Sequence, residues 1–374
     1  MLFFSDKTIS NSLPSRHILN LFSAALILIL AGCDSGDTDT SLLNEDDCSI
    51  PVGQVVSGGV AKDGIPSLQN PTLVEAGSAA AVYLQPENRV IGVVIDGEPV
   101  AIPHNILWWH EIVNLDLQSS QLAISYCPLT GSSIAFDRAQ HDGATFGVSG
   151  LLWQNNLIMY DRNTDETLWP QMLREGGCGT GRGQELTAFA SSEMSWSGWQ
   201  RLHPGTRVVS NATGFTRNYT ESGYPYGNYE EPDNAGTLFT QDVNDDRPPK
   251  ERVLGIPVGQ GGKLYPFFEL NATASASVVN DFVDGRPVVV FWDNLSEGAV
   301  AFESVLNGNR FNFAVNGDQF VDQETGSTWD LQGRAISGEM MGTQLTPVAE
   351  AYVAFWFAWK AFHPQSEVWL ASGN

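Results

Sequence analysis

The feature that most constrains the fold of this chain is an internal repeat that spans most of its length. Short matching segments recur in the same order, at nearly constant separation, as in Arg89-Val-Ile-Gly-Val93 and Arg252-Val-Leu-Gly-Ile256. Other matched positions follow along the chain: Pro103 with Pro266, Asn114 with Asn280, Trp169 with Trp329, and His203 with His363. Matches that keep one order predict two structural units of the same kind, packed against each other.

Each copy reads as a series of short strands. Residues 89–102, 121–126 and 132–136 are β-branched or alternating runs separated by Gly, Asp and Pro, which indicates strands. One short helix per copy is expected at residues 192–202 and 349–362, where aromatic residues recur at helical spacing before a His-Pro pair. We therefore predict a mainly β (β-rich α+β) fold, an internally duplicated pair of β-barrel or sandwich-like units, each with one short helix.

The N-terminal 32 residues are typical of a lipoprotein signal peptide. A basic start with Lys7 and Arg16 precedes an apolar run over residues 18–30 that is too short to span a bilayer comfortably. The run ends in Leu30-Ala-Gly-Cys33, which resembles the lipobox in which the cysteine receives a lipid. An ordinary signal peptide or an anchor helix is the alternative, but the small residues before Cys33 favour lipidation and cleavage.

Residues 33–50 are rich in Asp, Ser, Thr and Gly and are expected to form an acidic, flexible tether. Asp34 resembles a proteobacterial retention signal, which favours the periplasmic face of the inner membrane. The predicted organisation is a signal peptide (1–32), the tether (33–50), a first repeat unit with the candidate site (51–223), a connector (224–250) and a second, degenerate repeat unit (251–374).

The charge of the chain excludes some partners. A formal net charge of −24 argues against nucleic acid and anionic lipid, because both would be repelled. An acidic surface either keeps the protein soluble, which is the plainer interpretation, or attracts cations.

Cysteine usage singles out one thiol. If Cys33 is lipidated, Cys48, Cys127 and Cys178 are left, so at most one disulfide forms. Cys48 at the end of the tether and Cys178 in a glycine-rich loop are the candidates for that bridge. Cys127 is then the free thiol.

The repeat also separates structural from functional candidates. A residue needed for folding should occur in both copies, as His203 and His363 do; we predict that each ends a helix, with its basic ring at the negative end of the helix dipole. By contrast, His110, Glu111 and Cys127 occur only in the first copy. Their counterparts in the second copy are Ala276, Ser277 and Asp293.

These three residues are plausible chemical partners. A histidine stabilises a neighbouring thiolate and a carboxylate orients the ring, so Cys127 as nucleophile, His110 as base and Glu111 would form a thiol-dependent active site. Alternatively, Cys127 and His110 with Met159 or His104 would suit copper or zinc. The plainer interpretation is that Cys127 is a small buried hydrophobe and His110 a hydrogen-bonded core residue.

Two weaker signals concern calcium and a serine nucleophile. Asp161-x-Asn163-x-Asp165 and Asp242-x-Asn244-x-Asp246 share the start of a calcium-loop spacing but lack its later glycine and glutamate. Ser149 lacks the flanking glycines of a hydrolase elbow. We expect turns at the first two and no nucleophile at the third.

Several further motifs occur in a fixed order: Trp109-His-Glu-Ile-Val-Asn114, Tyr126-Cys-Pro-Leu-Thr-Gly131, Phe146-Gly-Val-Ser-Gly-Leu151, Leu157-Ile-Met-Tyr-Asp161, Trp196-x-x-Trp199 and His203-Pro204. Over roughly residues 89–369 the chain resembles the family named domain of unknown function 3179 (DUF3179). The resemblance implies a bacterial or archaeal, often exported protein whose Trp-His-Glu and Tyr-Cys-Pro motifs are family features. It implies no established activity.

The function expected from the sequence is that of a membrane-tethered periplasmic lipoprotein. We expect it to bind a metal ion or a small ligand at His110, Glu111 and Cys127. The alternatives are a thiol-dependent enzyme acting on an envelope substrate, and a scaffold whose tryptophans and connector tyrosines dock another envelope protein.

Overall fold

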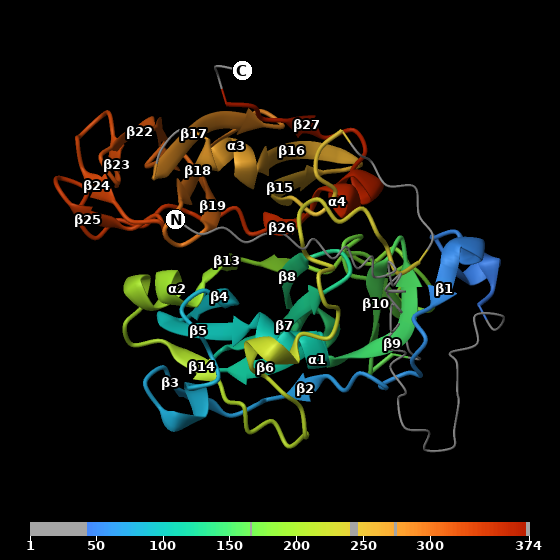
Figure 1. Cartoon of the computed structure of the whole chain (residues 1–374). Coiled ribbons are helices and arrows are strands. Elements are labelled where there is room, and N and C mark those ends of the chain that lie inside the picture. Colours follow the sequence, from blue (N-terminus) through green and yellow to red (C-terminus); the bar gives the residue numbers. More distant parts are fainter. Residues whose placement is uncertain (1–42, 165–166, 240–245, 273–274, 372–374) are drawn as a thin grey trace, which may run out of the picture. The chain divides into compact units, whose positions relative to one another are not determined.

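The computed structural model describes residues 43–164, 167–239, 246–272 and 275–371 (Figure 1). The signal peptide, Cys33 and Asp34 of the sequence analysis lie outside these residues, as do Asp165, Asp242 and Asn244. Among the described helices, none has the length and apolar character needed to cross a membrane.

The first half of the body consists of short strands, so the fold is mainly β, as predicted. β4 (Arg89–Ile95) and β5 (Glu98–Pro103) form a hairpin whose turn residues Asp96 and Gly97 have φ of +48° and +83°, as tight hairpin turns require. The following strands are β6 (Ile112–Leu117), β7 (Ser120–Cys127), β8 (Ser132–Asp137), β9 (Phe146–Trp153), β10 (Asn156–Asp161), β11 (Leu168–Pro170), β12 (Ala188–Phe189), β13 (Ser192–Ser195) and β14 (Arg207–Val209).

The second half repeats part of this order of strands and pairings. Its strands are β15 (Arg252–Val258), β16 (Gly261–Pro266), β17 (Ala276–Val283), β18 (Arg286–Asp293), β19 (Gly298–Glu303), β20 (Val305–Leu306), β21 (Asn309–Arg310), β22 (Phe313–Asn316), β23 (Gln319–Asp322), β24 (Thr328–Trp329), β25 (Ala335–Ser337), β26 (Tyr352–Phe355) and β27 (Glu367–Val368). β13 pairs antiparallel with β4 and β14 pairs parallel with β5; β26 and β27 pair in the same way with β15 and β16. The three strands β6-β7-β8 likewise correspond to β17-β18-β19.

Matched residues of the two halves make the same side-chain hydrogen bonds. The Asn114 amide donates to the Phe146 carbonyl and accepts from the Phe146 backbone N–H, both at 2.8 Å. Asn280 makes the same pair with Phe313, at 2.8 and 2.9 Å. These matched residues therefore have structural roles, which is what occurrence in both copies predicts.

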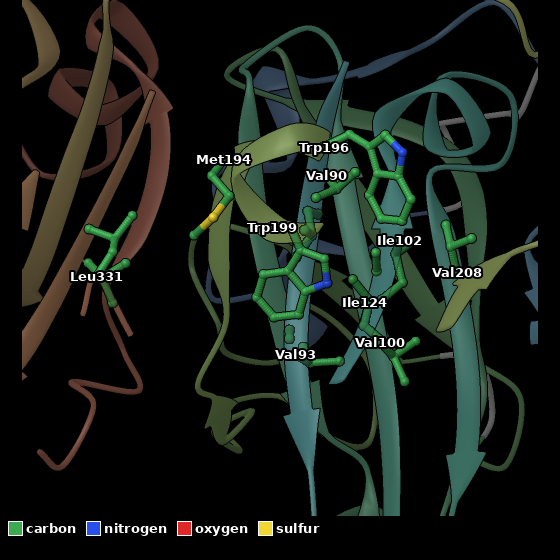
Figure 2. Packing of buried hydrophobic residues seen from close by; sticks show 14 of the residues in the cluster. Val90, Val93, Val100, Ile102, Ile124, Met194, Trp196, Trp199, Val208 and Leu331 are labelled. Atoms are coloured by element: carbon green, nitrogen blue, oxygen red, sulfur yellow. The ribbon is translucent and has the colours of Figure 1, made fainter. Parts of the chain in front are cut away.

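A tryptophan packs directly on a glycine in each half. A Cβ atom on Gly92 would lie 2.2 Å from the Trp199 ring, and one on Gly255 would lie 2.1 Å from Trp359. Only glycine allows this approach. Figure 2 shows Trp199 beside Val90 and Val93 in the core of the first half.

Among the described residues each half has two short α-helices, whereas the sequence predicted one helix. α2 (Trp196–Leu202) and α4 (Trp356–Phe362) lie within the predicted ranges, whose first residues form β13 and β26 instead. α1 (His104–His110) and α3 (Phe267–Asn271) follow directly after Pro103 and Pro266. Helices of seven and five residues are too short to show a helical period in the sequence.

His203 and His363 end α2 and α4, as predicted. Burial lowers the pKa of each ring to about 4, so both rings are neutral at pH 7. The predicted attraction between a charged ring and the helix dipole is therefore wrong, because burial disfavours the charged form.

One sheet runs through both halves, in the order β2-β6-β7-β8-β26-β15-β16-β27, and the halves meet where Val353 of β26 pairs with Ser133 of β8 (Figure 1). Met194 and Leu331, from opposite halves, belong to one hydrophobic cluster and face each other in Figure 2. Shorter N-terminal strands pair onto the first half: β1 (Val55–Ser57), β2 (Leu68–Gln69) and β3 (Leu73–Glu75).

Candidate functional site

Cys127 ends β7 and is buried, with 1% of its surface exposed. Its Sγ accepts a hydrogen bond from Leu157 N at 3.3 Å and donates one to the Asn155 carbonyl at 3.6 Å. Burial, together with the nearby Glu111 carboxylate, raises the pKa of the thiol to about 11. This environment opposes the thiolate that a nucleophile requires.

His110 is fully buried at the end of α1. Its Nδ1 donates to the Pro66 carbonyl at 2.7 Å, and its Nε2 lies 2.7 Å from the Tyr219 hydroxyl. Burial lowers the pKa of the ring to about 4, so the neutral ring accepts the Tyr219 proton at Nε2. Both ring nitrogens therefore have partners other than Cys127, as the plainer interpretation of His110 expects.

Glu111 is the member of the predicted trio that lies near Cys127. It follows α1 with φ +54° and ψ −31°, which is uncommon for a residue with a side chain. Its side chain is buried, and burial raises its pKa to about 8. Its charge acts on both Cys127 and Tyr226. The structure thus brings Glu111 and Cys127 together.

The remaining candidate metal ligands, Met159 and His104, have different neighbours. Met159 is buried in the same hydrophobic cluster as Cys127. His104 stacks on Tyr126, with 4.1 Å between ring centroids, and its Nε2 lies 3.7 Å from Glu193. Within the described part of the chain, no group of three His, Cys, Asp or Glu residues could hold a metal ion. The copper or zinc site stays a prediction.

The two weaker candidates have structural partners. The Asp161 carboxylate accepts from the Thr164 backbone N–H at 2.7 Å and from the Trp169 indole at 2.9 Å, as in a side-chain-stabilised turn. Ser149 lies within β9 and donates to the Ile158 carbonyl at 2.6 Å. A mid-strand position differs from the strand-to-helix turn of a hydrolase nucleophile.

Cys48 and Cys178, the pair that the sequence favoured, form a disulfide. The bridge joins residues 130 positions apart and ties the end of the predicted tether to the glycine-rich loop. Arg182 in that loop also donates to the Asp46 carbonyl at 2.6 Å. The last residues of the predicted tether are therefore fixed to the body.

A charge network that the sequence analysis missed lies where the two halves meet. Glu193 of β13 is buried and contacts Arg89 Nε at 2.5 Å and Arg252 Nε at 3.5 Å. Ser133 also donates to its carboxylate. Burial opposes ionisation of Glu193, but its interactions with Arg89, His104, Arg252 and the Ser133 hydroxyl outweigh it and hold its pKa at about 2. Arg89 and Arg252 are matched in the repeat, so the Glu193 carboxylate is shared by a symmetric pair of cations.

A cavity of about 520 Å³ lies beside this network. Residues at matched positions of the two halves line it: Arg89 with Arg252, and Trp108 with Asn271. The connector contributes Glu230, which accepts from the Tyr126 hydroxyl at 2.8 Å and pairs with Arg252 at 3.3 Å. The cavity therefore belongs to the junction and to neither half alone.

The connector tyrosines are buried or partly buried. Tyr229 is 6% exposed, and its hydroxyl donates to the Leu129 carbonyl at 2.8 Å. Tyr226 packs against the same hydrophobic cluster as Tyr229. The scaffold interpretation needs these rings on the surface; Tyr229 is buried whereas Tyr224 and Tyr226 are partly exposed, and the scaffold role stays a prediction.

Comparison with known proteins identifies the family of the chain. The family model described as "Protein of unknown function (DUF3179)" matches residues 62–366. No curated protein and no solved structure matches the chain. The matched range includes both halves, the connector and every residue of the Glu193 network. The chain belongs to the DUF3179 family.

Proposed function

We propose that this protein is a membrane-tethered, periplasmic lipoprotein that binds a small polar ligand in the cavity between its two halves. The cavity carries this proposal: its volume of about 520 Å³ lies within the range of small-molecule sites. Both halves and the connector contribute to its lining, which consists of charged, amide and aromatic side chains.

The Glu193 network supports a binding role. Assembling one carboxylate and two guanidinium groups in a buried place costs desolvation energy that apolar side chains would avoid. Such groups beside a cavity are candidates for function, and a fixed network holds the cavity wall in one arrangement. Arg89 and Arg252 are only 12% and 14% exposed, so their positions are set before a ligand arrives.

This proposal changes the location of the site expected from the sequence. We still expect a small ligand, but we place its binding site in the junction cavity and not at Cys127. The raised pKa of Cys127 and the occupied ring nitrogens of His110 favour neither thiol chemistry nor a metal at that position.

Lipid attachment at Cys33 is expected to be measurable directly. Cells supplied with an alkyne analogue of palmitate should label the wild-type chain, because the Leu30-Ala-Gly-Cys33 segment resembles a lipobox. Cys33→Ser should lose the label, whereas Cys127→Ser should keep it. Labelling that persists in Cys33→Ser would contradict the anchor.

Ligand binding is tested by a thermal-shift screen of a metabolite library on the full chain. A ligand of the cavity raises the melting temperature because it binds only the folded state. The shift should disappear in Asn271→Trp, since exposed Asn271 lines the cavity and a larger ring fills space there. Asn316→Trp, at an exposed position outside the cavity, should keep the shift. A library in which no shift depends on Asn271 would contradict the proposal.

A further inference from the structure

The cations of the cavity wall already have partners. Arg89 contacts Glu193 at 2.5 Å and Arg252 contacts Glu230 at 3.3 Å. Lys250 Nζ donates to two backbone carbonyls, at 2.7 Å each. An anionic ligand would have to displace these interactions before it gained its own.

The carboxylates of the wall are largely engaged as well. Glu230 accepts from Tyr126 at 2.8 Å, and Glu221 accepts from the Asn88 amide at 2.6 Å. Glu297 lies 3.6 Å from Arg89. The lining holds three cations and four carboxylates, so its formal charge is close to zero and it favours a ligand of low charge.

Aromatic side chains lie in the same wall, with Trp108, Phe267 and Trp292 buried at 8%, 7% and 2% exposed. Trp108 packs edge-on against Tyr224 with 4.9 Å between centroids, and Phe267 lies 4.7 Å from Trp292. Phe268 lines the cavity and is 50% exposed. Aromatic faces beside hydrogen-bonding groups suit a ligand that is apolar on one face and polar at its edges.

Two indole groups of the wall lack hydrogen-bond partners. The Nε1 atoms of Trp108 and Trp292 are buried and have no acceptor among the described residues. A buried donor without a partner is costly, and a ligand oxygen could supply the acceptor once a shift of the ring exposes the nitrogen to the cavity. A hydroxyl group both donates and accepts, so one hydroxyl-rich ligand can serve the indoles, the carboxylates and the amides of Asn228 and Asn271 together.

We propose that the cavity binds a short, neutral saccharide. This inference rests on the proposed ligand-binding function and names its ligand class. The C–H faces of the sugar rings would lie on the aromatic side chains, and the hydroxyls would bond the polar ones. A purely apolar ligand is disfavoured because it would take charged side chains out of water without replacing their hydrogen bonds.

The test uses the full chain in a sugar-free detergent, probed on a glycan array and then titrated while tryptophan fluorescence is followed. The titrants are the neutral disaccharides cellobiose, maltose and N,N′-diacetylchitobiose, with cationic chitobiose and anionic digalacturonate as charged counterparts. At least one neutral saccharide is expected to bind. Phe268→Ala should weaken that binding about tenfold, because it removes one stacking surface. Phe282→Ala is the matched control, since Phe282 is also 50% exposed but lies on β17 outside the cavity.

Three results would overturn the inference. They are binding of only the charged saccharides, neutral binding that Phe268→Ala leaves unchanged, and no saccharide binding up to about 10 mM, the limit of weak specific affinity. The metabolite screen with Asn271→Trp is independent of all three. A cavity ligand of another class found there would leave the ligand-binding function in place while the saccharide inference fails.

Discussion

Replacing Glu193 by glutamine is expected to lower the free energy of unfolding by about 3 to 5 kcal/mol at pH 7. The Glu193 carboxylate is the shared counter-charge of Arg89 and Arg252, which lie mostly buried at the junction. Glutamine keeps the shape and removes the charge, so both guanidinium groups lose their buried partner. Urea denaturation followed by tryptophan fluorescence measures the loss.

A matched control separates burial from ion pairing. Glu297 also lies near Arg89, at 3.6 Å, but its side chain is 66% exposed. Glu297→Gln is therefore expected to cost less than about 1 kcal/mol, as exposed ion pairs do. Equal losses in the two variants would show that the buried position of Glu193 does not matter, contrary to the prediction.

The effect of Glu193→Gln should also depend on pH. The folded-state pKa of Glu193, about 2, lies below its ordinary value of 4.5. The carboxylate therefore contributes its full stabilisation above about pH 4.5 and loses it as pH falls toward 2. The stability difference between wild type and Glu193→Gln should shrink over that window, and a difference that stays constant would contradict the assigned ion pairs.

The sequence predicted more of each half than of the junction between them. Strands could be predicted from local periodicity, and corresponding strands of the two copies could be predicted from matched residues. The strands and several of their pairings agree with these predictions. That the two copies arose by duplication stays a prediction. Glu193 could not be found in this way, because it belongs to no motif and Val353 occupies the equivalent place in β26. The one sequence feature that pointed to this network was the matched pair Arg89 and Arg252. A cation that is buried in both copies needs a carboxylate nearby.

The thiol hypothesis rested on the types of three residues, without the direction of their side chains or their partners in the fold. Side chains alternate along a strand, so Tyr126 and Cys127 of β7 belong to different hydrophobic clusters. His110 bonds instead to Tyr219, more than a hundred residues later in the chain. Neither the face of a buried strand residue nor such a distant partner can be read from one sequence. The disulfide pair could be favoured because Cys48 lies at the end of the tether and Cys178 in a glycine-rich loop.

Glu111→Gln is expected to raise the free energy of unfolding, by on the order of 3 kcal/mol at pH 7. Burial raises the folded-state pKa of Glu111 from 4.5 to about 8, so the folded protein keeps a proton that the unfolded chain releases. Stability contributed by this group is therefore present below about pH 4.5 and is lost as pH rises toward 8. Glutamine resembles the protonated acid and removes this dependence, so the gain should be near zero at pH 4.

Denaturation of Glu111→Gln at pH 4, 6 and 8 checks both the sign and the pH window. Glu339→Gln, at an exposed position, is the control and should change stability by less than about 0.5 kcal/mol at each pH. A loss of stability in Glu111→Gln at pH 7 would contradict a neutral, buried acid. A gain would show that folding does not require this carboxylate.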